Sequence, residues 1–313
     1  YKYNEDIFKK VTTLPGATNH GMVMVVDWSG SMYENLKGTL SQLYNLIWFC
    51  RRTQIPFEVF AFSDCRELFI DPTTGMRPYR HEINMKNFKA GDLALHRFKL
   101  LEFFSSKMSV KEEIEMMEIL WMIASYHSFE ADREIAWSKV PYPGFLNLGG
   151  TPLNDAIIAM MEIVPKFKRE TGVQKVNTIF LTDGDSNRLE GVYDYRLNTE
   201  TGEHTPYISN VYGTMTISDP KTLKNYEVAG YDITDGLLRI LKDRVDGMNL
   251  IGFFVAGSGR SGRVDKRALY SLQRELSMDA IMEQVKFINK NKYLVIDSKG
   301  YDEMYVLPAK GME

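Results

Sequence analysis

One short apolar stretch constrains the fold of this chain more than any other feature. Met22 to Val26 is continuously hydrophobic, is too short for a helix and stops abruptly at Asp27. An uninterrupted apolar run of this length is typical of a parallel strand, because such strands are covered on both faces and need not alternate. The sequence therefore predicts an α/β fold whose buried strand delivers polar residues to a crevice at its carboxyl end.

Three side-chain oxygens follow this strand. Asp27, Ser29 and Ser31 occupy alternate positions, so their side chains could converge on one point. Hard oxygen ligands with one negative charge suit Mg²⁺, Mn²⁺ or Ca²⁺ rather than a thiolate-binding metal. The alternative is a serine-rich turn in which Ser31 caps a helix over 33–50. Trp28 either lies open in the crevice or packs under the site.

The rest of the chain continues as alternating helices and strands. An amphipathic helix carries Leu36 to Cys50 on one side, and a strand over 57–62 follows it, which makes a right-handed βαβ unit. The other expected elements are strands at 176–182, 250–255 and 293–297, and helices from Pro152, over 234–246 and over about 264–287. This order predicts one doubly wound, Rossmann-like domain over 1–313, with a mostly parallel sheet flanked by helices.

Two segments are too long for simple connections. We expect 71–148 to be a helical insertion on the rim of the sheet, with one helix over 93–104. A second helix opens at a capping box formed by Ser109 and Glu112. Residues 188–232 are expected to form a β-hairpin insertion.

Two further polar groups lie at loops of the predicted sheet. Thr151 precedes a helix, and Asp183 directly follows a later strand. In a parallel sheet these loops can open on the same edge as the turn after the first strand. The alternatives are that Thr151 caps the helix from Pro152 and that Asp183 is only a turn residue. Asp155 and Asp185 are interpreted as solvated residues of a first helical turn and of a turn.

Taken together, the three motifs resemble the metal-ion-dependent adhesion site of von Willebrand factor type A domains. They are Asp27-x-Ser29-x-Ser31, Gly149-Gly-Thr151-Pro and Leu181-Thr-Asp183-Gly184, in the order of that family. The resemblance covers roughly residues 20 to 300, and the two insertions are not part of the common family core. The Gly-Thr-Pro-Leu-Asn variant is similar to the intracellular branch represented by the cobaltochelatase CobT subunit and its phage-encoded relatives.

The resemblance implies a metal site with a definite division of roles. Ser29 and Ser31 would bind Mg²⁺ directly, Thr151 directly or through water, and Asp27 and Asp183 mostly through water. Hydroxyls leave the charge of the ion unneutralised, so a carboxylate from a partner protein is the natural last ligand. The chain is thus expected to be a non-catalytic, Mg²⁺-dependent interaction module. Its expected partner is a hexameric AAA+ ATPase of the MoxR/CobS type, as in a chelatase or remodelling complex.

Two other functions fit parts of the sequence. In a Mg²⁺-dependent phosphohydrolase, Asp27 would be the nucleophile, but that chemistry needs a second carboxylate where Ser29 stands and a lysine near the phosphate. An extracellular adhesion module or a virion structural module would use the same metal site.

Composition limits the binding partners and the compartment that we expect for the chain. A formal net charge of −3 gives no general attraction to nucleic acid or to anionic membranes, and no apolar run approaches the roughly 20 residues that span a bilayer. The segment 257–262 lacks the Gly-Lys-Ser/Thr ending of a phosphate-binding loop. Cys50 and Cys65 make no disulfide framework and are expected to be reduced, which favours the cytoplasm, or a host cytoplasm for a phage protein. Because the chain opens on Tyr1, we expect residues upstream of it.

Overall fold

The computed structural model describes most of the chain. The described residues are 19–64, 88–94, 98–127, 143–184, 186–187, 191–200, 202–210, 213–229, 233–256, 264, 266–273, 275–298 and 300–309. Among them, no helix is long and apolar enough to cross a membrane.

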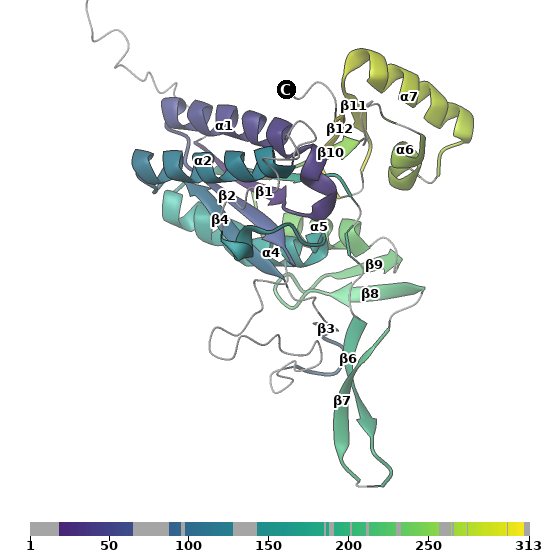
Figure 1. Cartoon of the computed structure of the whole chain (residues 1–313). Coiled ribbons are helices and arrows are strands. Elements are labelled where there is room, and N and C mark those ends of the chain that lie inside the picture. Colours follow the sequence, from purple (N-terminus) through teal and green to yellow (C-terminus); the bar gives the residue numbers. More distant parts are fainter. Residues whose placement is uncertain are drawn as a thin grey trace, which may run out of the picture.

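A seven-stranded sheet forms the centre of the molecule (Figure 1), in the order β11-β12-β10-β5-β1-β2-β4. The five inner strands are parallel to one another: β1 (His20–Asp27), β2 (Phe57–Ser63), β5 (Lys175–Thr182), β10 (Met248–Ala256) and β12 (Glu303–Pro308). The edge strands β4 (Lys99–Ser105) and β11 (Leu294–Ile296) are antiparallel. The predicted mixed α/β fold with a mostly parallel sheet is confirmed.

Helices cover both faces of this sheet. Figure 1 shows α1 (Leu36–Thr53) and α2 (Val110–His127) on one side, and α4 (Leu153–Thr171) and α5 (Ile233–Arg244) on the other. Val23 and Val25 of β1 pack against α4 and α5, whereas Met24 and Val26 pack against α1 and α2. The first strand is apolar without alternation because both of its faces are buried.

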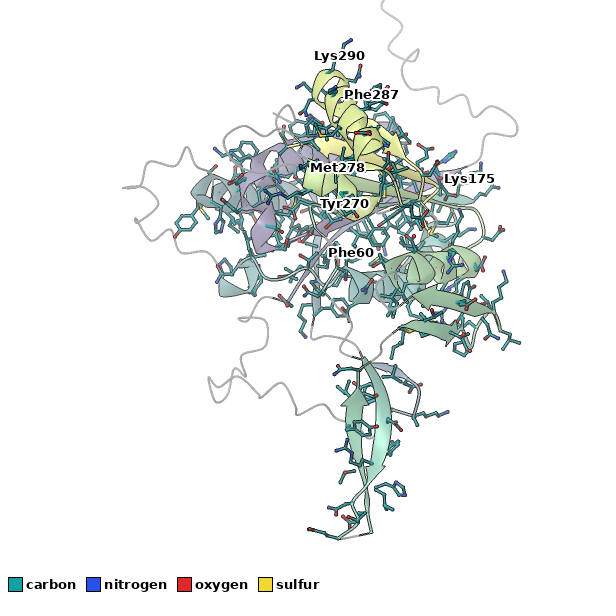
Figure 2. All side chains as sticks on the ribbon, turned by 90° about the vertical axis from the view of Figure 1, so that its right-hand side faces the viewer. Phe60, Lys175, Tyr270, Met278, Phe287 and Lys290 are labelled. Carbon is teal, nitrogen blue, oxygen red and sulfur yellow. The ribbon has the colours of Figure 1, made fainter. Side chains whose placement is uncertain are left out.

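A third apolar cluster lies at the β11 edge of the sheet. It contains residues from α6 (Lys266–Leu272), α7 (Met278–Asn291) and the strands β10, β11 and β12. The expected helix over 264–287 is therefore two helices, and Ser277 caps the second by accepting a hydrogen bond from the Ala280 N–H. Tyr270, Met278 and Phe287 remain exposed on these helices, as Figure 2 shows.

The segment predicted as a helical insertion is partly built into the main domain. The helix expected over 93–104 is wrong: β3 (Leu93–Ala94) and β4 lie there, and β4 pairs with β2. Phe103 and Phe104 are buried in the core, and a short apolar run does not distinguish a helix from a strand. Residues 71–87, 95–97 and 128–142 lie outside the described part.

The helix after the capping box is confirmed as α2. The Ser109 N–H donates to the Glu112 carboxylate at 2.9 Å, and the Glu112 N–H donates back to Ser109 Oγ at 3.3 Å. The helix α2 packs beside α1, where the Tyr44 hydroxyl donates to the Met117 carbonyl.

Residues 191–229 hold two hairpins rather than one. The expected hairpin is confirmed as β6 (Gly191–Leu197) and β7 (His204–Ser209), and it projects away from the sheet in both views. A second hairpin, β8 (Thr214–Ser218) and β9 (Asn225–Ala229), was not predicted.

Candidate metal site

The polar site lies at the point where the sheet changes its winding direction. From β1 the chain passes to β2 on one side, and β5 pairs with β1 on the other. Val26 of β1 lies opposite Leu181 of β5, so the residues that follow both strands emerge side by side. Open α/β sheets hold their ligands at such a switch point.

Four of the five predicted residues are brought together here. Ser31 Oγ donates to Asp183 Oδ1 at 2.7 Å, and Ser29 Oγ lies 2.9 Å from Ser31 Oγ. Asp27 is linked to the same strand end, because Thr182 Oγ1 donates to Asp27 Oδ2 at 2.7 Å. Side chains 152 residues apart thus share one cluster of oxygens.

The fifth residue, Thr151, is placed beside this cluster by its backbone. Ser29 and Gly149 form a parallel bridge, in which the Gly30 N–H donates to the Gly149 carbonyl at 2.7 Å. Thr151 follows two residues later and is 8% exposed. The loop before α4 therefore runs alongside the turn after β1.

Neither Ser31 nor Thr151 caps a helix, so that alternative is wrong for both. A short 3-10 helix at Gly30–Glu34 precedes α1. Its N-cap is Ser29, and the N-cap of α1 is Asn35. Neither residue caps its helix through a side-chain hydrogen bond. At α4, the first-turn N–H of Asn154 donates instead to Ser186 Oγ, at 3.0 Å.

Burial dominates the electrostatics of the site. Asp27 is fully buried, and this raises its pKa to about 7, against hydrogen bonds from Thr182 and Ser29 that lower it. The neighbouring Asp183 raises the Asp27 pKa further, and burial also raises the pKa of Asp183 itself. Asp27 Oδ1 has no hydrogen-bond partner among the described residues. A buried, unpaired carboxylate oxygen is costly, and a bound cation would offset that cost.

The set of donors fits a hard divalent ion. It consists of two carboxylates and three hydroxyls. Among the described residues, no group of three or more His, Cys, Asp or Glu side chains could hold a metal, so a metal site here would depend on the hydroxyl oxygens. Mg²⁺ is usually held by one or two carboxylates and keeps several waters. Asp27 forms the buried floor, whereas Ser31 is exposed, so the site opens towards solvent.

The structure settles two further predictions. Trp28 packs under the site: it is fully buried, its Nε1 donates to the Leu146 carbonyl at 2.8 Å, and its ring meets that of Phe103 edge-on at 5.0 Å. The interpretation of Asp155 as a solvated residue is wrong, because it is fully buried in the first turn of α4. Asp185 lies outside the described residues.

Sequence reasoning missed Asp64 and Asn187. Asp64 directly follows β2 and accepts a hydrogen bond from the Gly150 N–H, while Asn187 Nδ2 donates to Asp64 Oδ2 at 3.4 Å. The sequence held a signal for Asp64, because it directly follows β2 as Asp183 directly follows β5.

Fold and site together define a doubly wound α/β protein with an oxygen-lined site at its switch point. No family model and no curated protein matches the chain. Among solved structures, the pilus adhesin SpaC of Lactobacillus rhamnosus GG in its open conformation matches at 14% identity and a TM-score of 0.41, over 90% of this chain and 33% of the adhesin. Proximal thread matrix protein 1 of the mussel byssus matches at 12% identity and a TM-score of 0.32, over 89% of this chain and 49% of that protein. The chain thus spans half or less of each of these two proteins, and likenesses this weak carry no argument about function.

Proposed function

We propose that this chain is a non-catalytic, Mg²⁺-dependent protein-interaction module of the von Willebrand factor A type. One observation carries the proposal: the hydroxyls of Ser29 and Ser31 and the carboxylate of Asp183 meet at the switch point, above a buried Asp27 with an unpaired oxygen. These hydrogen bonds connect the Asp27-x-Ser29-x-Ser31 motif with Asp183 and are independent of the family resemblance.

Each residue has a distinct task in this proposal. Ser29, Ser31 and Thr151 would hold the ion through neutral oxygens, and Asp27 and Asp183 would balance part of its charge through bound water. The ion would supply an electrophilic position for a carboxylate of the partner. Ser31 is exposed and Asp183 is half-buried beside it, so a partner side chain has access from this side.

The burial of Asp27 supports binding rather than phosphate hydrolysis. A nucleophilic carboxylate must reach its substrate, but Asp27 is fully buried and its Oδ2 is occupied by Thr182. The position where a general acid would be needed is Ser29, whose hydroxyl lies against Ser31.

The proposed partner is a AAA+ ATPase of the MoxR/CobS type, which this chain would connect to a target as an adaptor. This assignment rests on the resemblance of the Gly149-Gly-Thr151-Pro loop to the CobT-like branch. The structure contributes the open side of the site, to which a partner's Asp or Glu could add the last oxygen ligand.

Calorimetric titration with Mg²⁺ tests the metal site, with Ser29→Ala and Ser31→Ala as site variants. Ser218→Ala is the matched control, because Ser218 is exposed on the second hairpin. We expect binding to the wild type and the control and its loss in both site variants. Equal binding by all four proteins would remove the site from consideration.

A pull-down with a MoxR/CobS-type ATPase tests the partner. Retention should require Mg²⁺, disappear in EDTA and fail with Ser29→Ala. Retention that survives both treatments would show that the metal plays no part in the interaction.

A further inference from the structure

The carboxylate of Asp64 holds the loop that carries Thr151. Asp64 Oδ1 accepts a hydrogen bond from the Gly150 N–H, and Asn187 links to Asp64 Oδ2 through its Nδ2. The Asn187 N–H in turn donates to the Thr151 carbonyl at 2.8 Å. The peptide groups on both sides of the Gly150–Thr151 bond are thus bound by two residues from the loops that follow β2 and β5.

Gly150 is fitted closely to this clasp of Asp64 and Asn187. A Cβ atom at position 150 would lie 2.8 and 2.9 Å from the two Asp64 oxygens and 3.1 Å from Asn187 Nδ2. A side chain at this position would have to push the Asp64 carboxylate aside, so glycine is what lets the backbone approach it this closely. The loop is therefore held in one position by direct backbone contact.

The clasp is anchored in the helices of one face. The Asn187 carbonyl accepts hydrogen bonds from Ser186 Oγ at 3.0 Å and from Asn154 Nδ2 at 3.4 Å. Asn154 Oδ1 accepts a further bond from Thr234 Oγ1 at 2.7 Å. Asn154 belongs to the first turn of α4 and Thr234 to that of α5, so the loop is tied to two packed helices.

We propose that Asp64 is a positioning residue that makes the metal site selective for Mg²⁺ over Ca²⁺, an inference that rests on the proposed function. Mg²⁺ demands near-ideal octahedral geometry with short bonds, whereas Ca²⁺ accepts six to eight ligands in flexible arrangements. A loop fixed by Asp64 presents Thr151 in one place, which favours the smaller ion. Releasing the loop costs Mg²⁺ affinity and leaves Ca²⁺ affinity nearly intact.

The test is calorimetric titration of the full chain with Mg²⁺ and, separately, with Ca²⁺. For Asp64→Ala we expect the Kd for Mg²⁺ to rise about 10- to 100-fold, as for other residues that orient metal ligands, and the Kd for Ca²⁺ to change less than roughly threefold. Asp64→Asn removes the charge but keeps an oxygen that can accept from Gly150, so its Mg²⁺/Ca²⁺ ratio should stay near that of the wild type. Asp297→Ala, at an exposed acid, is the matched control.

Gly150→Ala opens the same clasp from the other side and keeps Asp64. It should show the same loss of selectivity, and it decides the question if Asp64→Ala fails to fold. A wild-type chain that binds neither ion would overturn both this inference and the proposed function. A wild type that binds Mg²⁺, together with an unchanged Mg²⁺/Ca²⁺ ratio in Asp64→Ala or Gly150→Ala, overturns the inference alone. The inference is also overturned if Asp64→Asn loses as much Mg²⁺/Ca²⁺ selectivity as Asp64→Ala, because the effect would then come from the charge of Asp64 and not from its hydrogen bond.

Discussion

Replacing Asp27 by asparagine should stabilise the metal-free protein, and the gain should grow with pH. Burial raises the Asp27 pKa from 3.8 to about 7. Between these values the folded chain holds a proton that the unfolded chain has released, so the free energy of unfolding falls as the pH rises. Asparagine at position 27 does not titrate and avoids this loss.

The size of the effect follows from the pKa shift. A shift from 3.8 to about 7 corresponds to about 4 kcal/mol above the folded-state pKa. Part of this cost is already present near pH 5, so the advantage of Asp27→Asn should grow by up to about 3 kcal/mol between pH 5 and pH 8. Urea unfolding of both proteins in EDTA at the two pH values measures it.

Magnesium should offset part of this stability difference. At about one hundred times its Kd, a ligand that binds only the folded state adds about 2.7 kcal/mol, and Asp27→Asn should gain little of this. A stability difference between the two proteins that does not change with pH would refute the assignment of Asp27 as a buried, uncompensated acid.

Three further substitutions test an ion pair, a hydrogen bond under the site and the start of a helix. Asp219→Ala removes the nearer of two carboxylates from Arg244, in a largely buried ion pair that holds the Asp219 pKa well below its ordinary value, and leaves only Glu162 at 3.6 Å. Urea unfolding should show a loss of about 3 kcal/mol, at the low end for a broken buried pair, and a neutral result would contradict the pairing. The contribution of this pair should fade as the pH falls through the range in which Asp219 takes up its proton, because its pKa is lowered in the fold. Trp28→Phe removes the donor to the Leu146 carbonyl and should cost about 1–3 kcal/mol by the same assay, whereas an unchanged midpoint would argue against that hydrogen bond. Ser109→Ala removes one half of the capping box of α2 and should lower stability by about 1 kcal/mol in thermal unfolding, with no effect expected if the helix start is frayed.

The features that the sequence could predict depend on local patterns of residues. The first strand is recognisable because both of its faces are buried, which leaves an unbroken apolar run from Met22 to Val26. Asp27, Ser29 and Ser31 follow it directly, and Asp183 ends another strand of the same parallel sheet. Adjacency at one sheet edge then follows from topology alone.

The features that the sequence could not predict depend on contacts between segments that are far apart in the chain. Leu100 to Phe104 is apolar enough for a helix or a strand, and only pairing with β2 makes it the edge strand β4. The Gly150 N–H bound by Asp64 lies 86 residues further along the chain, so no local spacing reveals their contact. Asp155 has the sequence context of a solvated helix start, but α4 turns this residue into the protein interior.

Crystals soaked in Mn²⁺, a stand-in for Mg²⁺ with a usable anomalous signal, test the central claim most directly. The account predicts one anomalous peak at direct coordination distance from Ser29 Oγ and Ser31 Oγ, with Thr151, Asp27 and Asp183 around it. A peak elsewhere, or no peak between these five residues at saturating Mn²⁺, would contradict it.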